Sequence, residues 1–213
     1  MPSTQTEVRS FHGVAGVATG TPGRAAERAT PASYKPCVVW LSGLSGAGKT
    51  TLVTRLAQQL QGSVPHTVVL DGDRLRQGLC KDLHYSAADR SENLRRAGEV
   101  CKLLVDAGII VLAAFVSPAR ADRDMVRAML GQGEFIEVYC NAPLSICEAR
   151  DVKGLYAKAR DGRIPDFTGV SAPYEAPVSP ELVLDTAFQS IDGSLERILQ
   201  MLIQRGVIDI RQV

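Results

Sequence analysis

A glycine-rich segment, Gly-Leu-Ser-Gly-Ala-Gly-Lys-Thr at residues 43–50, most constrains how this chain folds. It follows residues 37–41, a short apolar run rich in valine that is typical of a buried strand. A helical pattern over residues 50–60 comes directly after it. A buried strand that leads through a glycine turn into a helix is the first unit expected of an α/β fold.

The alternation of short apolar runs and helical patterns continues along the chain. Further strands are expected at residues 67–70, 109–116, 135–139 and 182–184. Helices are expected after Ser86, which begins a capping box, over residues 122–130, and from Ile191 to Leu202. This order predicts an α/β fold, a three-layer sandwich whose parallel central sheet has helices on both faces.

Residues 1–35 differ in composition from the rest of the chain. They are rich in Gly, Ala, Ser, Thr and Pro, so they cannot bury enough surface to offset the entropy lost on ordering. We expect a flexible N-terminal tail at residues 1–35 and one domain over residues 36–213. A transit peptide is the alternative for the tail, but Glu7 and Glu27 count against it.

Composition narrows the class of partner. The 24 Lys+Arg and 23 Asp+Glu residues give a net charge of +1, which argues against binding nucleic acid or an anionic membrane through bulk charge. The longest apolar run, residues 109–116, is too short to span a bilayer, and residues 1–20 lack a secretory-signal pattern. The five cysteines have no CxxC spacing, which is typical of reduced, buried thiols in a cytoplasmic protein.

Residues 43–50 fit the pattern G-x-x-x-x-G-K-[ST] in the strand-to-helix context where it binds phosphate. Glycines let successive backbone N–H groups face one anion, and the following helix adds its positive end. Lys49 would place an ammonium beside the β- and γ-phosphates of ATP, and the Thr50 hydroxyl would ligate Mg²⁺. The candidate nucleotide-binding residues are Gly43, Leu44, Ser45, Gly46, Ala47, Gly48, Lys49, Thr50 and Thr51.

Two carboxylates, Asp71 and Asp73, follow the second expected strand. The carboxyl ends of parallel strands meet at one edge of a sheet, so they should converge there with residues 43–50 and with Ser117. A carboxylate beside ATP can hold Mg²⁺ or accept a proton from an attacking hydroxyl, although Asp and Gly also favour turns and helix caps. The absence of an NKxD-type segment argues against a GTPase. These residues indicate a compact kinase for a small molecule and leave the acceptor open.

Several segments together resemble the adenylylsulfate (APS) kinase family of P-loop kinases. They are GLSGAGKTT at 43–51, DGDRLRQGLCKDL at 71–83, DRSENLRRA at 89–97, FVSP at 115–118, KGLYAKAR at 153–160, FTG at 167–169 and SAPYEAP at 171–177. The resemblance covers about residues 36–207. It implies transfer of the γ-phosphoryl of MgATP to the 3′-hydroxyl of adenosine 5′-phosphosulfate (APS), giving 3′-phosphoadenosine 5′-phosphosulfate (PAPS).

The resemblance also implies which residues bind the sulfated nucleotide. Arg76, Arg90 and Asn93 would hold its phosphosulfate and adenosine, and a guanidinium suits this task because its planar fork donates two hydrogen bonds to an oxyanion. Tyr85 and Phe167 stand where the family sandwiches the substrate adenine. Substrate-binding residues should therefore come from both halves of the chain.

A basic lid is implied over about residues 151–175. Its closure would exclude water and bring Lys153 to the phosphoryl oxygens. Three positions depart from the family pattern: Val152 replaces a proline at the lid hinge, His84 replaces a glycine, and Ala119 replaces a tyrosine. A residue with a side chain is uncomfortable at position 84 if the backbone there needs a positive φ.

The implied catalytic residues are Lys49, Asp71, Asp73, Ser117 and Lys153. We expect Asp73 to orient or deprotonate the 3′-hydroxyl and to serve with Thr50 as a metal ligand, with Asp71 in support; the two aspartates could exchange roles. The serine matching Ser117 is phosphorylated in some family members. We favour direct in-line transfer, with Ser117 lining the site and able to acquire a phosphate, because positioning and charge neutralisation supply most of phosphoryl-transfer catalysis.

The family further implies a homodimer and a functional link to ATP sulfurylase. Two alternatives stay open. One is a P-loop kinase with another hydroxyl acceptor, such as a nucleoside or a sugar. The other is a non-catalytic nucleotide-binding subunit of a sulfate-activating complex, against which the intact Lys49, Thr50, Asp71 and Asp73 speak.

Overall fold

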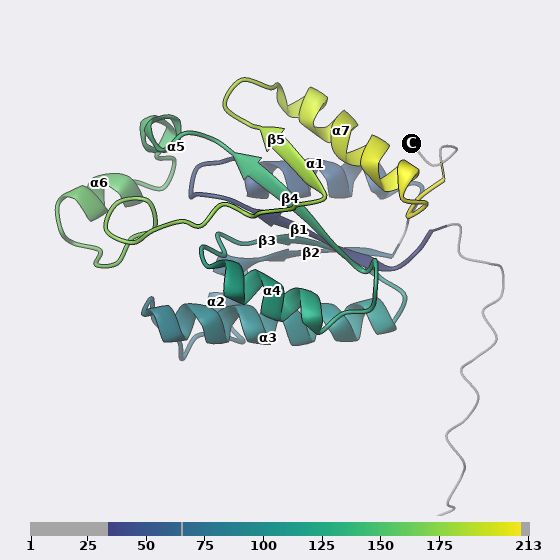
Figure 1. Ribbon diagram of the computed structural model, residues 1–213, viewed down its shortest axis with the longest axis horizontal. Helices are drawn as coiled ribbons and strands as arrows, with labels where there is room; N and C mark the ends of the chain where they lie inside the picture. Colours follow the sequence, from purple (N-terminus) through teal and green to yellow (C-terminus); the bar gives the residue numbers. More distant parts are fainter. Residues whose placement is uncertain (1–33, 65, 210–213) are drawn as a thin grey trace, which may run out of the picture. The chain divides into compact units, whose positions relative to one another are not determined.

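The computed structural model describes residues 34–64 and 66–209 (Figure 1). Most of the expected N-terminal tail, residues 1–35, lies outside these residues. Its last two residues are described, and both contact the domain. The Tyr34 hydroxyl lies 2.9 Å from His66 Nδ1, and the Lys35 amide donates to the carbonyl of Val207 at 2.8 Å. The domain packing therefore begins by residue 34.

Five parallel strands form one sheet in the order β2-β3-β1-β4-β5. They are β1 (Cys37–Ser42), β2 (Thr67–Asp71), β3 (Ile110–Ala114), β4 (Phe135–Asn141) and β5 (Leu182–Asp185). Each expected strand is present. β3 is shorter than the expected run of residues 109–116, because the chain turns at Ser117, whose φ of 39° is left-handed and incompatible with a strand.

Seven helices are described outside the sheet. They are α1 (Lys49–Leu60), α2 (Gly72–Gln77), α3 (Ala87–Asp106), α4 (Arg120–Ala128), α5 (Leu144–Arg150), α6 (Leu155–Arg160) and α7 (Ile191–Gln204). The four longer helices were expected from the sequence. The other three have six or seven residues, which is too short for a helical period to stand out.

Alternate residues of β1 point into two separate apolar cores. Val39 and Leu41 pack with residues of α1 and α7, whereas Val38 and Trp40 pack with residues of α3 and α4. Figure 1 shows α1 and α7 on one side of the sheet and α3 and α4 on the other. Both faces of the central strands are buried, which explains why those strands are continuous apolar runs and confirms the expected three layers.

β1 lies between β3 and β4. After β1 the chain forms β2 and β3 on one side of it, and then β4 and β5 on the other side. Ligands of open α/β sheets bind at such a switch point, outside the carboxyl ends of the strands. Residues 43–48 follow β1, residues 72–73 follow β2, and Ser117 follows β3 at this same edge. Within the described ranges, no helix is long and apolar enough to cross a membrane.

Candidate active site

A cavity of about 950 Å³ opens at the carboxyl edge of the sheet. It is lined by residues of the glycine-rich loop and by residues expected to bind the acceptor or to take part in catalysis. The expected residues along its walls are Ser45, Gly46, Gly48, Lys49, Thr50, Thr51, Asp71, Asp73, Arg76, Tyr85, Arg90, Asn93, Ser117, Lys153 and Phe167. Gly43, Leu44 and Ala47 do not line it, and Ala47 is fully buried in the core. One cavity therefore holds both clusters.

The glycine-rich loop is packed tightly against β4 and the helix that follows it. A Cβ at Gly46 would lie 2.8 Å from the carbonyl oxygen of Cys147, and the φ of Gly46 is +78°. Gly43 has a φ of +140° and a similarly close approach to the carbonyl of Cys140. Only glycine fits both restrictions, which explains the two residues that shape the start of the loop.

Lys49 begins α1, and its ammonium lies over the loop. Its Nζ donates to the carbonyls of Gly43 at 2.9 Å and Leu44 at 2.8 Å. The residue is 8% exposed, and burial lowers the pKa of its ammonium from 10.5 to about 8. This cation is poorly solvated and held at the phosphate-binding loop, so a bound anion would stabilise its charged form.

Asp71 is engaged on both carboxylate oxygens. Thr50 Oγ1 donates to its Oδ2 at 2.9 Å, and the backbone N–H of Asp73 donates to its Oδ1 at 2.9 Å. The second contact makes Asp71 the N-cap of α2. The helix-cap interpretation of this residue is therefore confirmed, and the same residue also lines the cavity.

Asp73 lies two residues further along the chain and contacts Lys153 of the expected lid. Its Oδ2 forms an ion pair with Nζ of Lys153, and both side chains are more than half exposed. The pKa of Lys153 is raised, first by this hydrogen bond. A hydroxyl and two carboxylates therefore lie near the start of α1, and such hard oxygen donors fit Mg²⁺.

Arg76 and Arg90 both lie close to the ring of Tyr85. Their guanidinium carbons are 4.5 and 5.8 Å from the centre of the Tyr85 ring. Arg76 Nη1 donates to the carbonyl of His84 at 2.8 Å, and Arg90 Nε donates to the carbonyl of Tyr85 at 2.8 Å. Two cations and an exposed aromatic ring thus line this part of the cavity, as the binding of an anionic nucleotide would require.

His84 fits this loop without backbone strain. Among the residues that the structure describes, Ser117 and Asp166 are the non-glycine residues with a φ in the left-handed region, so position 84 does not need a glycine. The His84 N–H donates to Asp89 Oδ2 at 3.1 Å, while Ser86 Oγ caps α3 by accepting from the Asp89 N–H. Asp89 thereby closes the expected capping box on His84 instead of Ser86.

Arg90 also contacts two residues of the expected lid. Its Nη1 donates to Thr168 Oγ1 at 2.9 Å, and its Nη2 donates to the carbonyl of Asp166 at 2.7 Å. These two residues flank Phe167, so α3 fixes the position of that ring. Arg90, Tyr85 and Phe167 are brought together, although 77 or more positions separate the first from the last.

Asn93 presents an unpaired amide to the cavity. The residue is 4% exposed, and its buried Nδ2 has no hydrogen-bond partner within the described part of the chain. A buried donor without a partner is costly unless a ligand or water accepts from it. Asn93 is therefore suited to hold an acceptor atom of a bound molecule.

Ser117 lines the cavity but is directed mainly into the fold. It is 2% exposed, and its Oγ accepts a 3.1 Å hydrogen bond from Trp40 Nε1. Arg123 Nη1 donates to its carbonyl at 2.6 Å. Its hydroxyl and its backbone are thus both held by buried neighbours.

Some residues that line the cavity beside the glycine-rich loop were not predicted from the sequence. Arg150 Nη1 donates to the carbonyl of Gly46 at 3.2 Å, and its Nη2 donates to the carbonyl of Thr186 at 2.8 Å. Thr186, Gln189 and Ser194 line the wall beside it. These residues follow β4 and β5, so their place at the carboxyl edge of the sheet was the available signal.

A parallel sheet with a phosphate-binding loop and a cationic second pocket in one cavity defines a P-loop kinase. The model of the adenylylsulphate kinase family matches residues 35–185. Adenylyl-sulfate kinase of Shewanella amazonensis is 55% identical over 182 residues, which cover 85% of this chain and 92% of that protein. The chain belongs to the adenylylsulphate kinase family, which confirms the resemblance found in its sequence.

Solved structures agree with this assignment. The APS kinase of Mycobacterium tuberculosis in complex with AMPPNP and APS is 42% identical, with a TM-score of 0.74 covering 79% of this chain and 98% of that chain. The hexameric APS kinase from Thiobacillus denitrificans is 31% identical, with a TM-score of 0.63 covering 84% of this chain and 31% of that chain. The expected α/β P-loop kinase fold is confirmed.

Proposed function

We propose that this cavity transfers the γ-phosphoryl of MgATP to the 3′-hydroxyl of APS, with the residue roles set out below. The chain is an adenylyl-sulfate kinase by family, and its products are ADP and PAPS. The observation that carries the assignment of roles is the cavity itself, which holds the loop around Lys49 and the pocket around Arg90. In-line transfer needs donor and acceptor in one enclosed site.

The donor binds at the glycine-rich loop. The backbone N–H groups of residues 43–50 and the ammonium of Lys49 hold the phosphates, with the positive end of α1 beneath them. Thr50 and Asp73 would hold Mg²⁺, with Asp71 in support, and the metal supplies charge neutralisation of the phosphate oxygens when bound. The hydrogen bond from Thr50 to Asp71 keeps these oxygens together beforehand.

Asp73 is the carboxylate that accepts the proton of the 3′-hydroxyl. Asp71 is the weaker candidate because both its oxygens are already engaged, by Thr50 and by the N–H of Asp73. Asp73 pairs instead with Lys153, which belongs to the lid of residues 151–175. Movement of Lys153 to the phosphoryl oxygens would free the Asp73 carboxylate at the step where a base is needed.

The acceptor binds in the pocket around Arg90. Arg76 and Arg90 hold its phosphosulfate, Asn93 donates its unpaired amide, and the adenine lies between Tyr85 and Phe167. Ser117 lines this wall and takes no covalent part in the transfer. As part of the same proposal, the protein is a cytoplasmic homodimer that receives its substrate from ATP sulfurylase.

A coupled assay for ADP release tests this function. ADP should appear only when MgATP and APS are both present, and PAPS should form in equal amount. Adenosine, AMP and gluconate, offered in place of APS, should give at most background release. Faster release with one of those acceptors would assign the protein another hydroxyl substrate, and binding of both nucleotides without turnover would indicate a regulatory subunit.

A further inference from the structure

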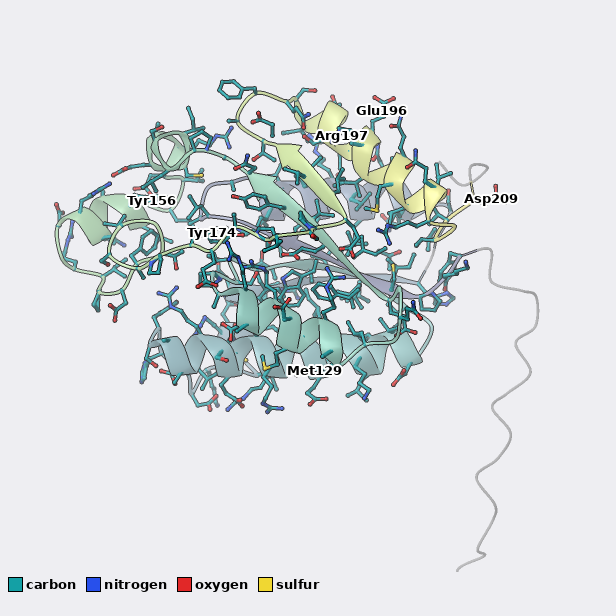
Figure 2. All side chains as sticks on the ribbon, in the orientation of Figure 1. Met129, Tyr156, Tyr174, Glu196, Arg197 and Asp209 are labelled. Atoms are coloured by element: carbon teal, nitrogen blue, oxygen red, sulfur yellow. The ribbon has the colours of Figure 1, made fainter. Side chains whose placement is uncertain are left out.

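Tyr156 connects the lid to the phosphate-binding loop. It lies in the first turn of α6 (Figure 2). It is 1% exposed, and its hydroxyl donates to the carbonyl of Ser45 at 2.9 Å. Ser45 and Gly46 both line the cavity. A buried tyrosine hydroxyl is expected to find a partner, but here the partner is a backbone group of the catalytic loop, 111 positions away in sequence.

The carbonyl that Tyr156 holds belongs to the peptide unit between Ser45 and Gly46. In a trans peptide the C=O and N–H bonds point in opposite directions. Fixing the Ser45 oxygen on the side of α6 therefore fixes the direction of the Gly46 N–H on the other side. Such N–H groups are what a phosphate-binding loop offers to its anion. Tyr156 thus orients an N–H group that can donate a hydrogen bond to the phosphate, without touching the phosphate itself.

The ring of Tyr156 supports the substrate end of the same cavity. Its centre is 5.0 Å from that of Phe167, and the two planes meet at 82° in an edge-to-face contact. Asp166 and Thr168, on either side of Phe167, accept hydrogen bonds from Arg90. One side chain therefore contacts both the loop for the donor and the aromatic ring for the acceptor.

The backbone of Tyr156 is itself fixed. Asp151 accepts from the N–H groups of Tyr156 and Ala157, each at 3.0 Å, which holds the first turn of α6. Arg150, the residue before it, bonds to the Gly46 carbonyl. Arg150 and Tyr156 therefore anchor the base of the lid on the loop, so a shift of the lid or of the loop would change the contacts of Tyr156.

We propose that Tyr156 is a positioning residue that couples the two nucleotide sites. Phosphates seated on the loop hold the Ser45–Gly46 peptide, the peptide holds the Tyr156 hydroxyl, and the ring then holds Phe167 against the adenine of the acceptor. By linkage, each nucleotide should bind more tightly when the other is present. This inference rests on the proposed function, because it takes the two sites to be those for ATP and APS.

Binding measurements on Tyr156→Phe test the coupling. We would determine the Kd of APS with and without saturating AMPPNP and Mg²⁺, using calorimetry or the fluorescence of the single tryptophan, Trp40, which stacks on the cavity residue Phe115. AMPPNP should tighten APS binding to the unaltered protein by about five-fold or more. In Tyr156→Phe that factor should fall below about two-fold, while APS alone binds within about two-fold of normal.

Tyr139→Phe is the matched control. It removes the same atom from a tyrosine that stacks on Tyr174 and does not line the cavity, so the factor should be unchanged. If Tyr156→Phe melts much earlier than the control, Phe167→Leu provides a second variant, which keeps the hydroxyl bond and removes the ring contact. It should lose the same factor.

Equal cooperativity in Tyr156→Phe and in the unaltered protein would overturn the proposal, and so would absence of cooperativity in the unaltered protein. Failure of the unaltered protein to bind either nucleotide would instead count against the proposed function. Binding of both nucleotides with no dependence on Tyr156 leaves that function intact and removes only the coupling.

Discussion

The guanidinium of Arg123 lies 2.9 Å from the carboxylate of Glu137, and these two side chains are 2% and 7% exposed. Arg123 also donates to the carbonyls of Ser117 and Glu175, so each nitrogen of the guanidinium has an acceptor. Burial keeps the pKa of Glu137 above its ordinary value, although Arg123 and Arg127 oppose this. This buried, hydrogen-bonded pair therefore ties α4 to β4 and to the turn that carries Ser117.

Removing one partner of this pair should be strongly destabilising. Arg123→Ala leaves the Glu137 carboxylate buried without its main partner, and we expect a loss of about 3–5 kcal/mol in the free energy of unfolding. Urea denaturation measures it. Arg95→Ala, which removes an exposed ion pair with Glu92, should cost far less, because solvent screens that pair. Similar small losses in both variants would mean that the buried pair does not stabilise the fold.

Loss of the Lys49 ammonium should abolish turnover without unfolding the protein. Lys49→Ala removes the charge held at the loop, and we expect kcat to fall by at least about 10³-fold because charge neutralisation dominates phosphoryl transfer. Circular dichroism and a melting curve would check the fold, and Lys102→Ala on the exposed face of α3 is the control. Near-normal activity of Lys49→Ala would contradict the assignment of the ATP site.

Nucleotide binding should weaken as the pH rises above about 8, because burial lowers the pKa of Lys49 to about 8 in the unliganded protein. A triphosphate needs the charged form, so above that pH the protein must take up a proton to bind it. The Kd of AMPPNP should then rise by up to about ten-fold per pH unit. Lys49→Met should bind weakly at every pH and lose this dependence between pH 7.5 and 9.5.

The same pKa predicts a change in stability of the opposite sign. The lysine is protonated up to pH 10.5 in the unfolded chain but only up to about pH 8 in the folded one. Between these values the unfolded state binds more protons, so this group makes the free energy of unfolding increase with pH.

If the Kd of AMPPNP instead rises as the pH falls below 8, a group other than Lys49 controls nucleotide affinity.

Arg90→Ala should separate the two nucleotide sites. The guanidinium contacts Tyr85 and the residues beside Phe167, and none of its hydrogen bonds reaches the glycine-rich loop. We expect the Kd of APS to rise about 10–100-fold, as when a charged hydrogen bond of about 1.5–3 kcal/mol is lost, while that of AMPPNP changes less than about three-fold. Calorimetric titration of each ligand measures this, and an equal loss of both affinities would count against two separate pockets.

Replacing each aspartate by its amide distinguishes their roles. Asp73→Asn removes the proposed base, so kcat should fall by about 10²–10⁴-fold with little change in APS binding. Asp71→Asn keeps an oxygen that can accept from Thr50, so a smaller loss is expected, and added Mg²⁺ should recover part of it. Steady-state kinetics at two Mg²⁺ concentrations gives the comparison; the reverse order of losses would exchange the two assignments.

Much of the fold is determined locally. The glycines of residues 43–48 specify the turn between β1 and α1, and the apolar run of β1 is buried on both sides. Ser86 caps α3 with the bond that its spacing predicts. The five cysteines are free and buried, as expected, and burial raises the pKa of Cys101 to about 12. Each of these features is indicated by the residue itself or by its near neighbours in the sequence.

The short helices and the lid contacts depend on distant residues. Nothing in residues 155–160 predicts that Tyr156 is buried against the glycine-rich loop, because its partner is the carbonyl of Ser45 and carries no side-chain signal. The same holds for Arg150, which bonds to the backbone of Gly46 and Thr186. Backbone acceptors are present at every residue, so a sequence pattern cannot indicate which of them a side chain will find.

The sequence by itself determined the glycine-rich loop and the succession of the five strands and four longer helices along the chain, and it predicted the residues proposed to bind an anionic acceptor, because each of these is written in short runs of neighbouring positions. Only the tertiary structure decided that Thr50 faces Asp71, that Lys153 pairs with Asp73, and that Arg90 reaches Asp166 and Thr168. Those contacts exist because a parallel sheet brings the ends of strands that are far apart in the chain to one edge, where packing sets which side chains meet.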